Sequence, residues 1–332
     1  APVRHPPPPE SLRHMAALAA GTRRLAGRLP ALGPHCGLRP GPRAPAAVSL
    51  GALQRRPHSS GSAPEQPPAS PGSQLSAALL WSRFVQWSYR TFGGSLFPEK
   101  TDICNCGADF GAPIPRPELV AREGIEQGSR EWRMQMFGAA LYWHMATNAR
   151  EKMVDADPEL LRGADVLEVG CMRGGGARYL VELAEPRRYL ATDSVEEHVE
   201  TCRKLFPGVP GLEFRRADAL QLAETLPEES FDFVLCVQAA AAFGDPAAFI
   251  RGVERVLRPG GRLLLCDGLS RQILGVMQST MSEVGMEQTV CADMSRAVHA
   301  AGLCKIPPGT SYIRLVAEKP LQPTGAAFSE GA

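Results

Sequence analysis

Acidic residues and lysines are almost absent from the first part of the sequence. Residues 1–58 contain no lysine and a single acid, Glu10, and no Asp or Glu occurs from Met15 to Ala63. The same 58 residues hold nine arginines. Pro, Ala, Arg, Gly and Ser dominate the first seventy residues, a composition that buries too little apolar surface to build a core. The sequence therefore predicts a disordered leader over residues 1–75.

This arginine-rich, acid-poor leader is typical of a mitochondrial transit peptide. Over about residues 15–58, Leu18, Leu25 and Leu29 fall near one side of a helix, with arginines around the rest. The segment Arg55–Ser60 offers a processing point, and Met15, the first methionine, is one candidate start of translation. We expect a mitochondrial protein of the matrix; a leader without an address is the alternative.

Long apolar runs and paired cysteines are also missing. No apolar run approaches the roughly 18–20 residues that cross a bilayer, so no transmembrane helix is predicted. The nine cysteines show no disulfide-like spacing, and Cys171, Cys236 and Cys266 lie in apolar runs where a free thiol packs as a small hydrophobe. Cys104 and Cys106 are too close together for the usual zinc spacing, so no metal site is predicted.

Beyond the leader the chain is acidic. The whole sequence holds 36 basic and 35 acidic residues, of which 27 and 34 follow residue 58. The remainder therefore carries an excess of negative charge and offers no basic, aromatic platform for nucleic acid.

Helices are expected first, and then strands and helices alternate. Residues 76–92 and 130–154 are predicted helices, and residues 76–155 a helical cap region that could serve as a lid. Strands are predicted at 165–169, 188–192, 212–215, 231–237 and 262–266, near 286–292 and at Ser311–Glu318, with helices at 175–184, 195–205, 246–257 and 271–284 and a turn at 258–261. This alternation predicts an α/β, doubly wound, mostly parallel seven-stranded sheet over residues 156–320, followed by a disordered tail, 321–332. Ligands of such sheets bind at the carboxyl ends of the strands.

A glycine-rich loop follows the first predicted strand, in DVLEVGCMRGGGARYL (Asp165–Leu180). A dinucleotide fingerprint needs glycine at its first, third and sixth positions, because a pyrophosphate must approach the backbone at the start of the next helix. Those positions hold Gly170, Met172 and Gly175, so the middle glycine is missing. The loop therefore disfavours NAD, although an NAD-dependent oxidoreductase remains a third reading.

Carboxyl groups near the strand ends favour S-adenosylmethionine, which carries an ammonium group and a sulfonium centre instead of phosphates. Glu168 can compensate that positive charge, and Asp193 can accept hydrogen bonds from both ribose hydroxyls. Asp193 would also suit NAD. Asp218 is placed to accept from the adenine amino group, with a helix cap as the alternative. Gln238 ends the fourth strand beside the expected sulfonium.

Together, LRGADVLEVGCMRGGGARYL, RRADAL and LPEESFDFVLCVQAAAAFGDPAAFIRGVERVLRPGGRLLLCD resemble a class I S-adenosylmethionine-dependent methyltransferase of the methyltransferase type 11 kind. The RGGGARY extension and the upstream ALYWHMA make the chain similar to the phthiotriolone/phenolphthiotriolone dimycocerosates methyltransferase group, over about residues 135–318. The resemblance implies S-adenosyl-L-methionine as the cofactor. It also implies a set of cofactor-binding residues: Glu168, Gly170, Cys171, Gly174, Asp193, Ser194, Asp218, Ala219, Gln238 and, through the cofactor's carboxylate, Tyr142.

The sequence departs from this family in three ways, one of them a short connection of about 25 residues between the helix ending near 284 and Ser311–Glu318. Glycine usually stands where Met172 does, so a methionine there is expected to weaken cofactor binding. The run from Ala239 to Phe243 replaces polar residues that face the substrate and cannot accept a proton. His144 is then the one candidate base near the expected mouth, with a structural histidine as the alternative; no catalytic residue is otherwise predicted.

The leading prediction is a methyltransferase that acts on a small, apolar, lipid- or quinone-like acceptor. The alternative is a catalytically weak or inactive protein of this fold that acts as a mitochondrial assembly or interaction partner. The acceptor, the methylated atom and the oligomeric state do not follow from the sequence.

Overall fold

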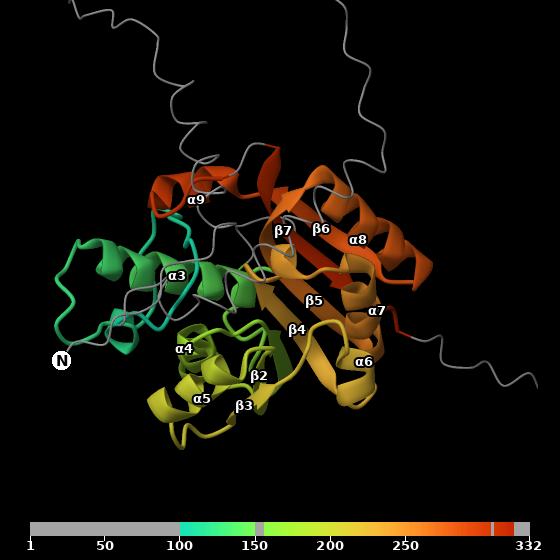
Figure 1. Cartoon of the computed structure of the whole chain (residues 1–332), viewed down its shortest axis with the longest axis horizontal. Helices are drawn as coiled ribbons and strands as arrows, with labels where there is room; N and C mark the ends of the chain where they lie inside the picture. The colour runs from blue at the N-terminus through green and yellow to red at the C-terminus, as the bar shows by residue number, and fades with distance from the viewer. Residues whose placement is uncertain (1–99, 150–155, 307–308, 322–332) are drawn as a thin grey trace, which may run out of the picture. The chain divides into compact units, whose positions relative to one another are not determined.

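The computed structural model describes residues 100–149, 156–306 and 309–321 (Figure 1). The chain divides into two units, Ala1–Glu65 and Gln66–Ala332, and all of the described residues belong to the second. The predicted leader, the predicted helix 76–92 and the tail from residue 322 lie outside the described residues. The domain boundaries drawn from the sequence therefore stay predictions.

A single seven-stranded sheet organises the described residues. Its strand order is β3-β2-β1-β4-β5-β7-β6. Neighbouring strands from β3 to β5 are parallel, whereas β7 runs antiparallel to both β5 and β6. In chain order the elements are η1 (Pro117–Leu119), α3 (Arg130–Thr147), β1 (Asp165–Val169), α4 (Gly175–Ala184), β2 (Arg188–Asp193), α5 (Glu196–Leu205), β3 (Leu212–Arg216), α6 (Leu222–Thr225), β4 (Phe231–Val237), η2 (Ala240–Ala242), α7 (Pro246–Val256), β5 (Leu257–Ser270), α8 (Arg271–Glu283), β6 (Glu287–Asp293), α9 (Ser295–Ala301) and β7 (Thr310–Glu318). The predicted doubly wound, mostly parallel sheet is confirmed.

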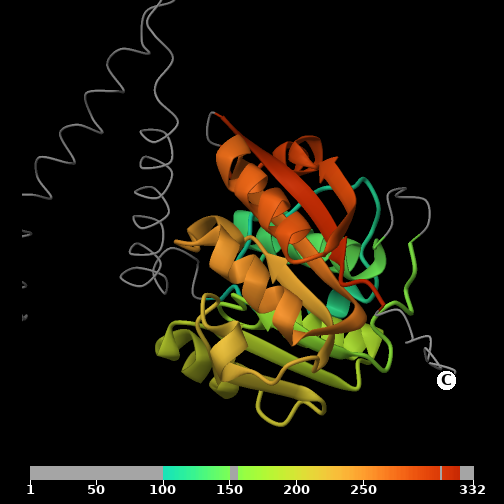
Figure 2. The same cartoon turned by 90° about the vertical axis from the view of Figure 1, so that its right-hand side faces the viewer.

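Helices cover both faces of the sheet because its central strands are apolar on both sides (Figures 1 and 2). All five residues of β1 are buried. Val166 packs into one cluster with α3, α4, α5 and α9, while Leu167 and Val169 pack into a second cluster with α6, α7 and α8. Successive side chains of a strand point to opposite faces, so a continuous apolar run feeds both cores.

Helices α3, α7 and α8 each begin at a residue whose side chain caps the first turn. Ser129 accepts a hydrogen bond from the Trp132 amide at the start of α3, and Ser270 accepts one from the Ile273 amide at the start of α8. At α7, Asp245 caps the Ala248 amide and Pro246 follows in the first helical position. Such caps satisfy backbone donors that have no partner inside a helix.

Three local predictions need correction. Helix α3, predicted over 130–154, ends at Thr147, and residues 150–155 lie outside the described ranges. The expected turn at 258–261 lies inside β5, where Leu257 pairs with Phe231 but Arg262 already pairs with Phe233, so the intervening residues bulge out. Helix α9 was not predicted, because its seven residues are too short to show a clear helical period. None of the described helices has the length and apolar character of a membrane span.

Candidate functional site

Two neighbouring strands, β1 and β4, end side by side, and the residue after each has an unusual backbone. Gly170 follows β1 with φ of 87°, and Gln238 follows β4 with φ of 56°. Positive φ is the left-handed region, which glycine adopts freely and other residues rarely. The chain thus turns sharply at both strand ends. This is the point at which the strand order reverses, where open α/β sheets bind ligands.

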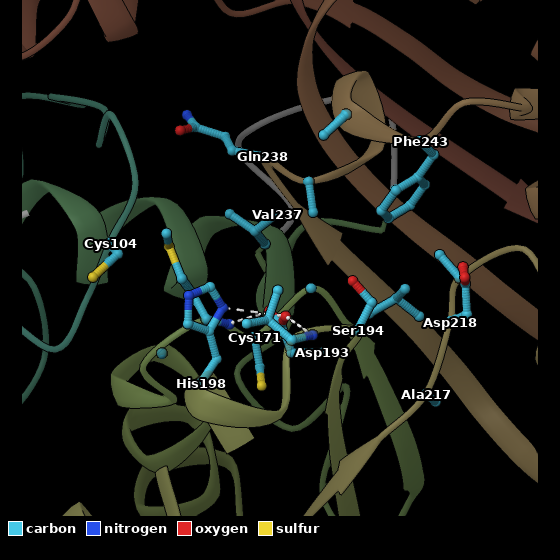
Figure 3. A pocket seen from close by; sticks show the side chains of 18 of the residues that line it. Cys104, Cys171, Asp193, Ser194, His198, Ala217, Asp218, Val237, Gln238 and Phe243 are labelled. Carbon is cyan, nitrogen blue, oxygen red and sulfur yellow. Dashed lines mark hydrogen bonds and ion pairs between the residues drawn. The ribbon is translucent and has the colours of Figure 1, made fainter. Parts of the chain in front are cut away.

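A pocket of about 930 Å³, counted out to open solvent, lies over these strand ends. Figure 3 shows Asp193, Ser194, Asp218 and Gln238 around it, with His198 beside Asp193. The pocket lining comprises Asp102, Cys104, Tyr142, Val169, Gly170, Cys171, Met172, Gly176, Asp193, Ser194, Val195, His198, Ala217, Asp218, Ala219, Leu220, Val237, Gln238, Ala239, Ala242 and Phe243.

Most of the glycines in the loop make room for the chain's own residues. A Cβ atom on Gly175 would lie 2.7 Å from the backbone of Asp102, and one on Gly176 would lie 2.1 Å from the ring of Tyr142. The Gly175 amide donates to the Asp102 carbonyl oxygen at 3.1 Å. The first amide of α4 is therefore already satisfied by protein. A pyrophosphate would need that helix terminus free.

Met172 occupies the position where glycine was expected, and its backbone keeps the glycine conformation. Its φ is 52°, a left-handed angle that costs a non-glycine residue about 1–2 kcal/mol. A methionine with negative φ could point away from the pocket, whereas one that keeps the glycine conformation could crowd it. The observed φ is positive, and Met172 lines the pocket. Its amide donates to Asp193 Oδ2 at 3.0 Å, which anchors the loop to β2.

Met172→Gly is expected to raise the free energy of unfolding by about 0.5–1 kcal/mol. Relief of the left-handed angle outweighs the greater freedom that glycine adds to the unfolded chain. Urea unfolding of the full chain measures the change. Met172→Ala keeps a Cβ at the same angle and is the matched control, which should gain nothing. Equal stability of the alanine and glycine variants would contradict the strain at Met172.

Asp193, at the end of β2, is buried and holds the neighbouring loops together. Besides the Met172 amide on Oδ2, its Oδ1 accepts from the Val195 amide at 3.0 Å and lies 3.2 Å from His198 Nδ1. A carboxylate has about four acceptor positions, and three are used. Bidentate binding of a ribose, as predicted from the sequence, therefore requires His198 to move aside or share its position.

His198 is a site residue that sequence analysis missed. It lies on α5, one turn beyond Asp193, and lines the pocket. The sequence could have indicated His198, because a helix that starts just after a strand places its first turn beside the end of that strand. His198 is a polar residue five positions after Asp193, the acid at the strand end.

Glu168, the acid predicted to balance a cationic ligand, lies behind the pocket wall instead of in the lining. Only 1% of it is exposed, and both carboxylate oxygens are covered by tyrosine hydroxyls. Tyr142 donates to Oε1 at 2.6 Å and Tyr189 donates to Oε2 at 2.9 Å. Tyr142 itself lines the pocket, so the charge of Glu168 can reach a ligand only across this ring.

Burial raises the pKa of Glu168 to about 7, against the opposing effect of the two tyrosine hydrogen bonds. A carboxyl group in an unfolded chain titrates near 4.5. Between these values the folded state holds a proton that the unfolded state has lost, so folding stability falls as the pH rises from about 4.5 to about 7. Above about pH 7 the buried carboxyl group is charged, and its full contribution to folding stability has been lost.

Glu168→Gln should therefore stabilise the protein at pH 8 but not at pH 5. The expected gain in unfolding free energy at pH 8 is on the order of 3 kcal/mol, since each unit of pKa shift corresponds to about 1.4 kcal/mol. Chemical denaturation of wild type and variant at both pH values gives the comparison, and subtraction removes the contributions of other groups. A difference between the two proteins that does not change with pH would contradict the assignment.

Of the remaining residues that the resemblance assigned to the cofactor, the structure places all but one in the pocket lining. Cys171, Ser194, Asp218 and Ala219 line the pocket, as do Gly170 and Gln238. Gly174 does not; it is the cap residue of α4, and a Cβ there would lie 2.6 Å from the ring of Phe214. Asp218 also accepts from the Leu220 amide at 3.0 Å, so it shapes the turn before α6 while facing the pocket.

An N-terminal segment that the sequence did not place also borders the pocket. Asp102 and Cys104 are part of the lining and precede α3. Asp102 is ion-paired with Arg122 and accepts from Gln135 Nε2 at 2.6 Å. The Cys106 amide donates to Gln238 Oε1 at 2.6 Å, which fixes the side-chain amide of Gln238. Its Nε2 is buried and has no hydrogen-bond partner among the described residues.

His144 does not lie where the sequence placed it. It is absent from the pocket lining, stacks on Phe110 with ring centroids 4.2 Å apart, and lies 3.3 Å from Asn148 Nδ2. Burial, together with the positive charge of Arg314, lowers the pKa of His144 to about 4. A base of that strength away from the pocket does not serve proton removal, and the structural alternative describes the residue.

The alanine run after β4 forms a tight turn. Ala240–Ala242 is a 3-10 helix, and the Ala241 amide donates to Asp267 Oδ2 at 2.8 Å. A Cβ on Gly170 would lie 2.3 Å from the Cβ of Ala239, so small residues are needed on both sides of the strand ends. Ala239, Ala242 and Phe243 give this end of the pocket an apolar wall.

The chemistry of the lining is acidic at one end and apolar at the other. Asp193 and Asp218 face the pocket with Glu168 behind it, and no Lys or Arg lines it within the described residues. Nor do those residues contain a cluster of three His, Cys, Asp or Glu side chains that could hold a metal ion. Such a site favours a ligand with hydroxyl groups, amino groups and positive charge over a phosphate.

Comparison with known proteins agrees with this geometry. Residues 167–265 match a family described as a methyltransferase domain. The chain is 43% identical over 109 residues to a phthiotriol/phenolphthiotriol dimycocerosates methyltransferase of Mycobacterium ulcerans, covering 32% of this chain and 38% of the relative. It is 34% identical over 127 residues to a fatty-acid O-methyltransferase of Mycolicibacterium smegmatis, covering 38% and 45%. The aligned region thus spans less than half the length of these relatives.

Two solved structures share the fold at low sequence identity. The [4+2]-cyclase SpnF aligns with a TM-score of 0.51 at 17% identity, covering 73% of this chain and 97% of that one. A geranyl diphosphate methyltransferase aligns with a TM-score of 0.50 at 11% identity, covering 70% and 98%. The strand order, the strand-end acids and the matched domain agree. Residues 167–265 are thus similar to the methyltransferase domain of class I S-adenosylmethionine-dependent enzymes, and the seven-stranded sheet has that fold.

Proposed function

We propose that the protein transfers a methyl group from S-adenosyl-L-methionine to a small, apolar acceptor. The observation that carries the proposal is the distribution of charge in the pocket. Acids follow β2 and β3, no basic side chain of the described residues lines it, and Asp102 occupies the first amide of α4. A positively charged adenosyl ligand gains from this arrangement, whereas a dinucleotide would meet negative charge and a filled helix terminus.

Each part of the cofactor has a matching part of the pocket. Asp193 is offered to the ribose hydroxyls and Asp218 to the adenine amino group, with Ala219 beside it. The amino-acid half then lies against the Gly170 loop and Tyr142, through which Glu168 acts. The cofactor supplies an electrophilic methyl group on a good leaving group. Alignment and exclusion of water can then provide much of the acceleration.

The acceptor belongs to the apolar end of the pocket. Val237, Ala239, Ala242 and Phe243 form that wall and offer no proton acceptor. The two relatives are named for lipid acceptors, a phthiotriol dimycocerosate and a fatty acid. Both lines of support favour a lipid- or quinone-like molecule. An acceptor that is already nucleophilic at neutral pH, such as a carboxylate, needs no base from the protein.

Transfer of a labelled methyl group tests the proposal. The full chain is incubated with methyl-labelled S-adenosylmethionine and a panel of a long-chain fatty acid, a hydroxylated lipid and a hydroxyquinone. Radiolabel should enter the organic extract with at least one of them, and S-adenosylhomocysteine should form in equal amount. Ala242→Asp, which places a charge in the apolar wall, should lower turnover more than tenfold. Transfer that is insensitive to this variant would overturn the placement of the acceptor.

The alternative is a protein of this fold with weak or no activity that acts as an assembly partner. Met172 and the alanine run are the observations that favour it. Folded protein that binds no adenosyl ligand at millimolar concentration would select this alternative.

For localisation we propose the mitochondrial matrix, supported by the arginine-rich, acid-poor leader. Fusion of residues 1–75 to a fluorescent protein, with the leader arginines replaced by glutamine as the control, tests it. Import of the arginine form alone supports the proposal, and equal distribution of the two forms contradicts it.

A further inference from the structure

Two thiols and a phenol meet on the side of the molecule where the N-terminal segment contacts β7. The Tyr312 hydroxyl donates to Cys106 Sγ at 3.2 Å and lies 3.6 Å from Cys304 Sγ. Both thiols therefore lie against the same phenol oxygen, and their side chains are close enough to influence each other's pKa. Cys106 precedes α3 and Cys304 follows α9, so residues far apart in the sequence form this cluster.

The cluster favours reaction at Cys304. The contacts of Cys304 with Cys106 and with Tyr312 lower the pKa of its thiol to about 7, although burial opposes them. The contact with Cys304 and burial raise the pKa of Cys106. Both cysteines are half-buried, so small solutes can reach them. The thiolate is the reactive form of cysteine, and Cys304 is therefore the nucleophile of the pair.

A second thiol pair in the same protein provides the contrast. The thiols of Cys171 and Cys202 are also close enough to influence each other's pKa, but only 4% and 0% of these residues are exposed. The contact with Cys202 and burial hold the pKa of Cys171 well above its usual range. The thiols are close together in both pairs. Only in the cluster at Tyr312 are they partly open to solvent, and only there does one cysteine, Cys304, have a lowered pKa.

The cluster is connected to the pocket by one backbone hydrogen bond. The Cys106 amide donates to Gln238 Oε1 at 2.6 Å, and Gln238 lines the pocket with a left-handed φ of 56°. Gln238 Nε2 has no partner among the described residues, so this bond is what orients the side chain. A shift of Cys106 therefore acts directly on the end of β4.

We propose that Cys106 and Cys304 form a peroxide-sensitive dithiol, and that its oxidation to a disulfide releases Gln238 at the edge of the pocket. Neither the family match nor the methyl-transfer chemistry involves this pair. The inference goes beyond the proposed function and does not depend on it.

The reaction needs only hydrogen peroxide as the oxidant. The Cys304 thiolate attacks one peroxide oxygen, the O–O bond breaks, and with one proton the products are a sulfenic acid and water. The Cys106 thiol then attacks the Cys304 sulfur and expels the second water, which leaves the disulfide. Two electrons pass from the two sulfurs to the peroxide. A disulfide bond is shorter than the contact between two thiols, so the two cysteines have to approach each other, and we expect this shift of Cys106 to break the bond from its amide to Gln238.

Peptide mapping and amide exchange test both halves of the proposal in the full chain. Reduced protein is treated with a small excess of hydrogen peroxide, alkylated and digested with trypsin without reductant. Residues 101–122 and 297–305 should appear as one linked peptide, lighter by two hydrogens than the sum of its parts. In the oxidised protein the Cys106 amide should exchange with deuterium roughly tenfold faster, as expected for one lost hydrogen bond.

Variants make the assignment specific. Cys304→Ser and Cys106→Ser should each abolish the linked peptide and the peroxide effect on exchange. Cys104→Ser, a change in the same tryptic peptide, should leave both. A link that persists in Cys106→Ser, the absence of any link, or a link without faster exchange at Cys106 would each overturn the proposal. None of these readouts requires an adenosyl ligand, so failure here is distinct from failure of the proposed function.

Discussion

Replacing Asp193 with alanine should weaken binding of S-adenosylhomocysteine by about a hundredfold. The proposed binding mode pairs this carboxylate with two ribose hydroxyls, and loss of a charged hydrogen-bond partner costs about 1.5–3 kcal/mol. A hundredfold change in the dissociation constant corresponds to about 2.7 kcal/mol. The alanine also leaves the amides of Met172 and Val195 without their acceptor, so the loop itself loses its anchor to β2.

Isothermal titration of the wild type and the variant measures this change. Glu213→Ala is the matched control, because Glu213 lies on the adjacent strand β3 with its side chain 45% exposed and outside the pocket lining. It should bind as the wild type does. His198→Ala separates the two roles of Asp193, since it frees an acceptor position on the carboxylate and should not weaken binding. Wild-type affinity in Asp193→Ala, with a native circular dichroism spectrum, would contradict the ribose assignment.

Gly176→Ala should lower the free energy of unfolding by about 2–3 kcal/mol, although it adds one methyl group to a helix that would otherwise gain from alanine. The new Cβ would lie 2.1–2.5 Å from three ring atoms of Tyr142. Overpacking of this size costs about 1–3 kcal/mol. The ring cannot withdraw freely, because its hydroxyl is bonded to the buried carboxylate of Glu168.

Thermal and urea unfolding measure the loss, and a second variant isolates its cause. Tyr142→Ala removes the ring, so Gly176→Ala made in that background should cost much less than in the wild type. The difference is the coupling energy of the pair. Gly275→Ala is the matched control on α8, where an added Cβ meets nothing within 4 Å. Independent, additive effects of the Gly176 and Tyr142 changes would contradict the contact.

The alternating part of the fold could be predicted closely because its signals are local. Strands β1 and β4 coincide with their apolar runs, and both lie in the middle of the sheet, where such runs are buried on two faces. The long β5 could not be predicted, since the proline and glycines at 258–261 signal a turn. These residues form a bulge within a strand because β5 pairs with β4 along one side and with β7 along the other.

The candidate site was predicted less well where contacts are non-local. Asp193, Asp218 and Gln238 were found because a strand end is a local feature. The reason for glycine at positions 175 and 176 could not be predicted, because the residues that need this space, Asp102 and Tyr142, come from an earlier part of the chain. The position of His144 depends on which way α3 faces as it packs against α4, and no local pattern fixes that rotation.

Glu168 shows a different limit. Its place in the sequence was read correctly as an acid late in the first strand, but a strand's alternating faces allow it to point at the pocket or behind it. The partners that settle the question, Tyr142 and Tyr189, are recognisable only in three dimensions. Under the proposed function, the charge of Glu168 would have to reach the cofactor across the ring of Tyr142.

The central claim, that the pocket takes a positively charged adenosyl ligand and not a dinucleotide, is tested most directly by one calorimetric comparison. The full chain is titrated with S-adenosylmethionine, S-adenosylhomocysteine and NADH under one set of conditions. The account predicts micromolar binding of both adenosyl ligands and no measurable binding of NADH, with Met172 tolerated in the loop. NADH binding tighter than that of both adenosyl ligands would contradict it.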